Sequence, residues 1–326
     1  MMTKNNTFAE IGEKLLKAKK IYIFPHVIMD CDSLGSGVAL ALGLRSLGKE
    51  ADIIIEDNLA KNIKFLDKGY CINYKDIEEP ADTVVCVDCG ELSRFPLRTE
   101  LFNKGETKIC LDHHKTSEPI CDFNYIDPTA AATGEVIYKL LKEMKVEFTA
   151  EIGEAIFAAI TTDTGNFQYS NTTKETHLIT AELAEFGTDY NKVSVSIYEN
   201  ESLEKIKLQG KILSNLDIFA DNKAAIGIVT QEMLKDCNAT MDDSEGVVAQ
   251  IRAIEGIEIA ILLRERQGNV VKASIRSKTN FDVTRIACKY DGGGHKKAAG
   301  CTMNGNIKDI VEILKKDVEE GFAKGY

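Results

Sequence analysis

Histidine and aspartate gather in a few short segments of this 326-residue chain. Four of its five histidines lie in such segments: His26 in HVIMDCDS, His113 and His114 in LDHH, and His295 in DGGGHKKAAG. In the N-terminal half they are accompanied by five acids, most of which follow short β-branched runs: Asp30, Asp32, Asp88, Asp112 and Asp163. A carboxylate is almost never buried unless it is paired or coordinates a metal, so core packing does not explain this pattern. Imidazole and carboxylate groups at strand ends suit divalent ions, and two such ions side by side hydrolyse phosphate esters.

The HxxxDxD spacing that begins at His26 places three ligand-type side chains within one turn. In a loop after a strand, Asp30 and Asp32 could each reach a different ion of such a pair. The alternative is a helix start in which Asp32 or Ser33 caps the first free amides. Capping accounts for one acid and leaves His26 and Asp30 without a role.

Three further positions favour a metal site over a structural one. Asp88 follows the apolar run VVCV and could bridge two ions, although an acid before Gly90 also suits a turn. The adjacent histidines of LDHH point to different sides, so one can bind a metal while the other faces a substrate. Asp163 ends an apolar helical segment, where the helix dipole disfavours negative charge, and a ligand role would compensate that cost.

The C-terminal part offers groups that could hold an anion. Gly292, Gly293 and Gly294 expose backbone amides beside His295, and Arg276 lies between two serines in SIRS. Backbone amides and a guanidinium are suitable donors to a phosphate. A glycine-rich loop alone is weak evidence for such a site.

Composition narrows the class of substrate. The formal net charge is −11, and no run of Lys or Arg is longer than two residues, as in Lys296–Lys297. Proteins that track along nucleic acid usually carry a basic stripe, so we expect a small anionic substrate and no duplex.

No apolar run is long enough to span a membrane, and the first twenty residues lack a signal-peptide core, which predicts a cytoplasmic protein without a membrane partner. Nine scattered cysteines, with Cys86 and Cys89 as the one CxxC pair, indicate reduced thiols and no zinc ribbon.

The elements that must position these groups alternate along the first half of the chain. Strands are expected at 21–24, 51–57, 83–88 and 107–112, and helices at 7–18, 35–47, 132–145 and 149–162. This alternation predicts an α/β domain with a parallel, Rossmann-like sheet flanked by helices. Ligands of such sheets collect beyond the carboxyl ends of the strands, where the histidine and aspartate segments fall.

The pattern changes after about residue 217. Strands are expected at 224–230, 257–266 and 269–277, and helices at 243–253, 281–290 and 307–323. A smaller α+β domain is therefore predicted over 217–326, after a catalytic domain over 1–198 and a connecting helix over 199–216. The active site is expected in the cleft between the two domains.

The segments HVIMDCDSLGS, VVCVDCGE, CLDHH and TTDTG, followed by GGGHKKAAG, occur in the order typical of one family. The chain resembles the DHH phosphoesterase family with its DHH-associated C-terminal domain. In its length, the chain most resembles the stand-alone branch of this family, whose members hydrolyse short oligoribonucleotides (nanoRNA) and 3′-phosphoadenosine 5′-phosphate.

The resemblance implies a role for each matching residue. Two Mn²⁺ ions, with Mg²⁺ or Co²⁺ as substitutes, would be bound by His26, Asp30, Asp32, Asp88, His113 and Asp163, with Asp88 bridging. Asp112 would orient a ligand, and His114 would face the scissile phosphate. The substrate's terminal phosphate or nucleotide would be held by Arg276 and by the segment Gly292, Gly293, Gly294 and His295.

The sequence departs from the family pattern at two places: Cys31 stands between two ligand acids, and Asp291 replaces a glycine beside the phosphate-holding segment.

The function expected is Mn²⁺-dependent hydrolysis of short single-stranded RNA or small nucleotides. One alternative is hydrolysis of cyclic or linear diadenylate, and another is a nucleotide-binding sensor without turnover. The sequence leaves open whether the chain forms a homodimer.

Overall fold

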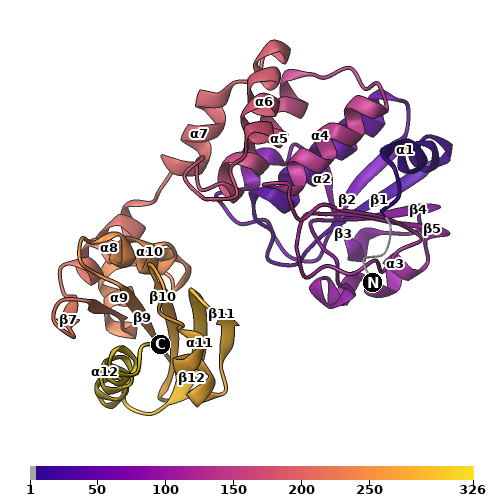
Figure 1. The fold of residues 1–326 in the computed structure, drawn as a ribbon. Coiled ribbons are helices and arrows are strands. Elements are labelled where there is room, and N and C mark those ends of the chain that lie inside the picture. Colours follow the sequence, from indigo (N-terminus) through magenta and orange to yellow (C-terminus); the bar gives the residue numbers. More distant parts are fainter. Residues whose placement is uncertain (1–4) are drawn as a thin grey trace. The chain divides into compact units, whose positions relative to one another are not determined.

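The chain forms two compact units, Met1–Asn200 and Glu201–Tyr326, which are described separately here (Figure 1). The computed structural model describes residues 5–326. Within that range no helix is both long and apolar enough to cross a membrane.

The first unit is built on a parallel sheet of six strands, which confirms the predicted Rossmann-like architecture. The strands are β1 (Lys20–Pro25), β2 (Glu50–Ile55), β3 (Cys71–Asn73), β4 (Thr83–Val87), β5 (Thr107–Asp112) and β6 (Phe123–Ile126). Their order across the sheet is β3-β2-β1-β4-β5-β6. The central strands are apolar runs buried on both faces, which is why the sequence pattern revealed them. The two edge strands, β3 and β6, are short and only partly buried, and the sequence analysis missed both.

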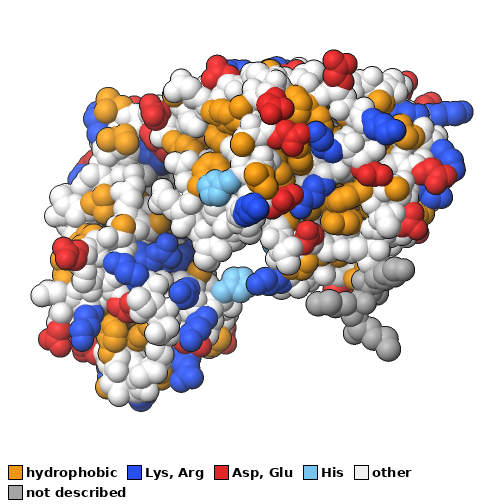
Figure 2. Space-filling model, turned by 45° about the horizontal axis from the view of Figure 1, so that its top comes forward, with side chains coloured by type: hydrophobic (Ala, Val, Ile, Leu, Met, Phe, Trp, Pro, Cys, Tyr) orange, Lys and Arg blue, Asp and Glu red, His pale blue; other side chains and the backbone are white. Residues whose placement is uncertain are grey.

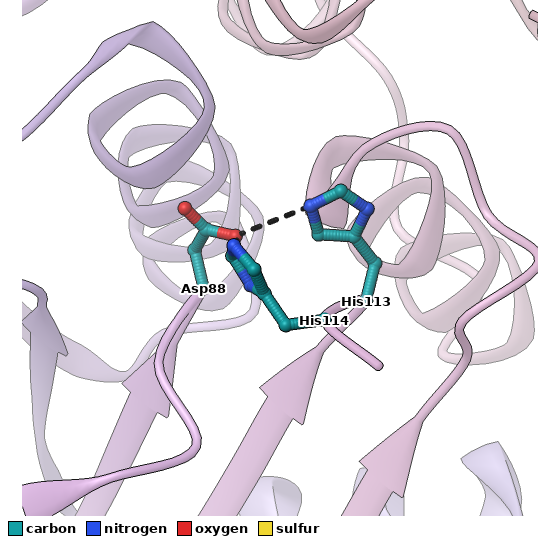
Figure 3. A group of neighbouring side chains, drawn as sticks. All are labelled: Asp88, His113 and His114. Atoms are coloured by element: carbon teal, nitrogen blue, oxygen red, sulfur yellow. Dashed lines mark ion pairs between the residues drawn. The ribbon is translucent and has the colours of Figure 1, made fainter. Parts of the chain in front are cut away.

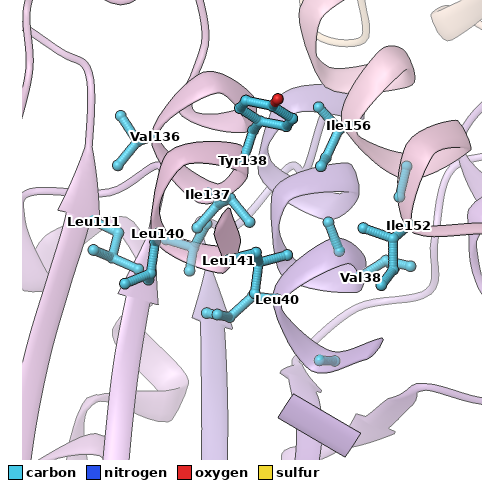
Figure 4. Packing of buried hydrophobic residues seen from close by; sticks show 14 of the residues in the cluster. Val38, Leu40, Leu111, Val136, Ile137, Tyr138, Leu140, Leu141, Ile152 and Ile156 are labelled. Carbon is cyan, nitrogen blue, oxygen red and sulfur yellow. The ribbon is translucent and has the colours of Figure 1, made fainter. Parts of the chain in front are cut away.

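The helices of this unit pack on the sheet or on one another. They are α1 (Phe8–Lys17), α2 (Cys31–Ser46), α3 (Thr99–Asn103), α4 (Thr133–Glu143), α5 (Ala150–Asp163), α6 (Lys174–Leu183) and α7 (Tyr190–Tyr198). Side chains of α2, α4 and α5 form the main core with strand residues such as Leu111 (Figure 4). Gly35 lets α2 approach α5 closely, because a Cβ there would lie 2.5 Å from the carbonyl oxygen of Ala155. A second cluster on the opposite face of the sheet includes Phe24, Phe95 and Phe102.

The second unit is a mixed sheet with helices, as predicted for an α+β domain. Its strands are β7 (Asp217–Phe219), β8 (Ala224–Val229), β9 (Ile259–Arg266), β10 (Val270–Ser277), β11 (Gly293–His295) and β12 (Ala298–Asn304), in the order β11-β12-β10-β9-β8-β7. Only β8 and β9 pair in parallel among these strands. The helices are α8 (Leu203–Leu213), α9 (Gln231–Cys237), α10 (Val247–Ala253), α11 (Thr284–Ala287) and α12 (Ile307–Lys324).

Three segments differ from their predicted form. The helix expected from residue 35 begins at Cys31, because Asp30 caps it. The segment 199–216 contains the shorter helix α8, whose Leu208 and Ile212 are buried in a core with residues of β8, β9 and α10. The glycine segment is not a free loop: Gly293–His295 pairs with β12 as an edge strand.

The sheet order explains why distant segments converge. Strand order reverses between β1 and β4, and these neighbouring strands end at Pro25 and Val87. His26 and Asp88 come directly after them. In doubly wound sheets the crevice at this reversal, beyond the carboxyl ends of the strands, is the usual ligand site.

Candidate metal centre

The imidazole of His26 is oriented by its own loop. Its side chain is only 5% exposed, and Nδ1 lies 2.7 Å from the carbonyl oxygen of Val27. When the ring is neutral, its hydrogen therefore belongs on Nδ1 and the Nε2 lone pair is left for a metal. Nε2 lies 3.4 Å from Asp88 Oδ2 and 3.7 Å from Asp30 Oδ2.

The two acids at the start of α2 have different surroundings. Asp30 is the helix cap, with Oδ1 accepting from the Ser33 amide at 2.9 Å, and its Oδ2 remains directed to His26. The capping function therefore falls on Asp30 and not on Asp32 or Ser33, but it does not use the whole carboxylate. Asp32 is fully buried and accepts the backbone N–H groups of Thr133 at 2.8 Å and Gly134 at 3.0 Å. The positive end of α4 thus stabilises this carboxylate.

Asp88 occupies the position between the two histidine segments. It follows β4 in a left-handed conformation, with φ 58°, and its backbone N–H donates to Leu111 on β5. Its carboxylate is 3% exposed and accepts from the Thr133 hydroxyl at 2.8 Å on Oδ1. Oδ1 faces His113 and His114, while Oδ2 faces His26.

Two histidines follow β5, and Figure 3 shows them beside Asp88. They differ in their other partners. His113 Nδ1 lies 3.2 Å from the carbonyl oxygen of Ala130, and its Nε2 lies 3.2 Å from Asp163 Oδ2. The same Nε2 is 3.6 Å from Asp32 Oδ2 and 3.7 Å from Asp88 Oδ1. Asp163 is the last residue of α5, so its carboxylate does stand at the negative end of a helix.

His114 is held by Asp112 and stays more open to solvent. Its Nδ1 lies 2.8 Å from Asp112 Oδ1, and its side chain is 44% exposed. Asp112 is fully buried and also accepts the amides of His113 and His114 and the hydroxyl of Ser117. With Nδ1 engaged in this way, Nε2 is the ring nitrogen that could contact another molecule.

The buried carboxylates of the cluster repel one another, so added positive charge would stabilise them. Burial, followed by repulsion from Asp88 and Asp163, holds the pKa of Asp32 well above its usual range. Burial also raises the pKa of Asp88, against the opposite effect of its hydrogen bond with His26. Burial disfavours protonation of His26 and His113, yet the surrounding carboxylates outweigh it and raise the pKa of each to about 10. Protons on the histidines thus partly neutralise acids that a divalent ion would neutralise fully.

The donor atoms fall into groups that fit such ions. His26, Asp30 and Asp88 form one group, Asp32, His113 and Asp163 a second, and Asp88, His113 and His114 a third; within each, one ligand atom per residue lies within 4.8 Å of the others. Imidazole Nε2 atoms oriented by carbonyl groups and carboxylates oriented by backbone amides are the partners expected around a metal. The cluster can therefore bind divalent metal.

The second unit carries a cationic cavity of about 450 Å³ on one face of its sheet. It is lined by Arg264, Arg266, Lys272 and Arg276, together with the acids Asp242 and Glu245. Figure 2 shows Lys and Arg side chains gathered on this unit. Burial, then repulsion from Arg266 and Arg276, lowers the pKa of Arg264 against the opposite effect of Glu245. Repelling guanidinium groups around a polar cavity favour an anionic ligand.

Sheet register relates this cavity to the predicted phosphate-holding residues. Ala298 pairs with Arg276 on one side and with His295 on the other, so all three lie in one row across β10, β12 and β11. Lys272 lines the cationic cavity and also a second one, of about 460 Å³, bordered by Gly292, Gly293 and Thr302. The structure thus places Arg276 and the glycine segment on the same sheet.

Sequence reasoning missed several residues at these sites. Arg264, Arg266 and Lys272 are spaced along two antiparallel strands, so they never form a basic run in the sequence. Thr133 contacts both Asp32 and Asp88, but nothing in TAAATGE distinguishes it from an ordinary helix start. Cys86 lies 3.7 Å, sulfur to sulfur, from Cys121 on another segment, so the CxxC spacing did not indicate its partner.

Comparison with known proteins agrees with this two-unit arrangement. Residues 20–160 match the DHH family, N-terminal domain, and residues 223–320 match the DHHA1 domain. The bifunctional oligoribonuclease and PAP phosphatase NrnA of Thermus thermophilus is 34% identical, over 96% of this chain and 94% of the relative. The protein of the same name from Bacillus subtilis is 27% identical, over 87% of this chain and 89% of its own length.

A solved structure has the same architecture throughout. The exopolyphosphatase-related protein from Bacteroides fragilis superposes with a TM-score of 0.87 at 27% identity, over 96% of each chain. The two domain matches cover most of the described structure, in the order that the histidine and aspartate segments had indicated. The protein belongs to the DHH family of phosphoesterases, with a DHHA1 domain after the DHH domain.

Proposed function

We propose that this chain is a two-metal phosphoesterase that hydrolyses short single-stranded oligoribonucleotides and 3′-phosphoadenosine 5′-phosphate. The main support for the proposal is that Asp88 belongs to two of the donor groups: its Oδ2 faces His26 and its Oδ1 faces His113. A sensor that only binds a nucleotide would not need this arrangement. The relatives named as oligoribonuclease and PAP phosphatase support the choice of substrate.

In this proposal His26 and Asp30 hold one ion, Asp32, His113 and Asp163 hold the other, and Asp88 contacts both. Mn²⁺ is the ion proposed, because a mixed imidazole and carboxylate set suits it better than Mg²⁺, which prefers oxygen. Bound divalent ions supply Lewis acidity toward the phosphate and activate a water molecule.

The protein's own groups position the substrate and move protons. Asp112 holds Nδ1 of His114, and that hydrogen bond, although burial opposes it, raises the pKa of His114 and so favours the doubly protonated ring. We propose that Nε2–H donates to an oxygen of the scissile phosphate. Arg276 and His295, with Gly292, Gly293 and Gly294, are proposed to hold a terminal phosphate. The cationic cavity beside Arg276 extends that site.

The proposal can be tested with purified protein and Mn²⁺ on a panel of substrates. Dinucleotides and 3′-phosphoadenosine 5′-phosphate should be hydrolysed, single-stranded RNA should react more slowly as it lengthens, and duplex RNA should not react. Cyclic and linear diadenylate belong in the same panel, because faster hydrolysis of either would replace the proposed substrate. Asp88→Asn should abolish turnover while the protein stays folded. Less than one Mn²⁺ per wild-type chain at saturation, together with activity that resists a chelator, would rule out the two-metal mechanism.

A further inference from the structure

Ile28 combines an unfavourable backbone conformation with an exposed side chain. Its φ is 57°, in the left-handed region, and its side chain is 88% exposed. It lies midway between His26 and Asp30 in the first metal-binding segment. A β-branched residue in the left-handed region is a true outlier, because its Cβ crowds the following carbonyl group.

The surrounding contacts hold the backbone in this conformation. On one side, the backbone N–H of Val27 donates to the carbonyl oxygen of Arg94 at 2.6 Å. On the other side, the side chain of Met29 packs against the main core, and Asp30 caps α2. With both neighbours fixed, the left-handed conformation at residue 28 is the one that joins them. Strain of this kind persists where the surroundings determine it, and it gathers at functional sites.

The identity of the residue needs a separate explanation. Glycine or asparagine would meet the same backbone requirement at lower cost. A single exposed isoleucine is ordinary on a protein surface, but here the side chain adds strain and gains no burial within its own unit. A favourable contact arises only when another molecule covers it. Its place between two proposed metal ligands makes the bound substrate the molecule that arrives there.

We infer that Ile28 is a specificity-determining residue that packs against the nucleobase of the nucleotide whose phosphate is hydrolysed. The inference rests on the proposed function and adds a contact to it. An isoleucine side chain offers no hydrogen bond, so it distinguishes a nucleotide from a sugar phosphate without a base. It does not distinguish one base from another.

The test compares Ile28→Asn with wild-type protein on a 5′-phosphorylated diadenosine dinucleotide and on two analogues, each with one base removed. Ile28→Asn should raise KM for the complete dinucleotide about tenfold, the effect of losing part of one buried aliphatic side chain. On the analogue that lacks the contacted base, KM should change less than twofold. Ile28→Val should behave like wild type. Ile206→Asn, at an isoleucine 53% exposed on α8, is the control for an exposed position elsewhere.

Two further measurements separate this role from a structural one. The thermal midpoint of Ile28→Asn should equal or exceed that of wild type, because asparagine tolerates the left-handed region. Mn²⁺ binding should be unchanged. Equal changes of KM on all three substrates, no change on any, or a loss of Mn²⁺ binding would overturn the inference. If wild-type protein hydrolysed no nucleotide, the proposed function would fail, and calorimetric binding of the same three ligands would still decide the role of Ile28.

Discussion

At Thr133 the structure predicts a large effect on metal binding from a small change in side-chain shape. Its hydroxyl donates to Asp88 Oδ1 at 2.8 Å, and its backbone N–H donates to Asp32 Oδ2 at 2.8 Å. Thr133→Val removes the first hydrogen bond and keeps the second, with a side chain of nearly the same shape. The substitution therefore tests the position and charge of Asp88 alone.

The magnitude follows from the burial of both partners. Thr133 is fully buried and Asp88 is 3% exposed, so water cannot replace the lost donor. A hydrogen bond to a charged group contributes about 1.5–3 kcal/mol, which corresponds to roughly tenfold to hundredfold in a binding constant. Loss of partners behind metal ligands weakens metal binding by a similar factor, about tenfold to hundredfold. We expect Mn²⁺ affinity to fall within that range, and turnover at limiting Mn²⁺ to fall with it.

The assay is a Mn²⁺ titration followed by the electron paramagnetic resonance signal of the free ion. Thr133→Ser keeps the hydroxyl and should bind Mn²⁺ nearly as wild type does, although the lost methyl group lowers stability. Ser36→Ala removes one donor from Asp32 Oδ1, but the carboxylate keeps the amide of Gly134 on Oδ1 and the amide of Thr133 on Oδ2. This variant should therefore have a smaller effect than Thr133→Val. Wild-type Mn²⁺ affinity in Thr133→Val, or equal losses in the valine and serine variants, would refute the reasoning.

Three other predictions concern stability and the second unit. The pKa of His26 and of His113 is about 10 in the folded protein, above the unfolded value of about 6.5. Protonation of these rings therefore stabilises the metal-free protein fully below pH 6.5, and this contribution disappears as the pH rises through 10. Thermal midpoints of chelator-treated protein should therefore fall over that interval, and a midpoint independent of pH would contradict it. Arg276→Ala and His295→Ala should each lower kcat/KM for nucleotides about tenfold to hundredfold and leave Mn²⁺ binding unchanged, and a loss of metal would show that these residues were assigned the wrong role. Arg98→Met should lower the free energy of unfolding, measured by urea denaturation, by about 3–5 kcal/mol. The reason is that Arg98 is fully buried against Glu56, with 3.0 Å between Nε and Oε2. A loss of less than about 1 kcal/mol would mean that Glu56 finds another partner.

The sequence predicted what depends on local pattern. Apolar runs such as TVVCV revealed the buried central strands, and the acids and histidines after them indicated a common edge. The edge strands β3 and β6 escaped because they are three and four residues long and gain their form only by pairing with β2 and β5. The start of α2 was placed too late because Asp30 was considered only as a ligand, whereas one of its oxygens caps the helix.

Contacts between distant segments could not be predicted from spacing. Thr133 meets Asp88 across 45 positions of sequence, and only the packing of α4 against the sheet brings them together. The sequence analysis did not predict the cationic cavity for a related reason. Side chains alternate between the two faces along β9 and β10, so Arg264, Lys272 and Arg276 lie on one face although residues of the opposite face separate them in the chain. A count of basic runs therefore underestimated the positive charge available to a substrate.

The position of Asp163 at the end of α5 bears on the order in which the protein can acquire metal as it is synthesised. Chains emerge from the ribosome N-terminus first. The residues of the group His26, Asp30 and Asp88 have all been synthesised once the chain has passed β4. The group of Asp32, His113 and Asp163 still lacks its last carboxylate at that stage, because α5 follows β6 and α4. A nascent chain thus contains every residue of the first donor group before it contains Asp163 of the second, and Asp88 gains its contacts with Leu111 and Thr133 only when β5 and α4 follow.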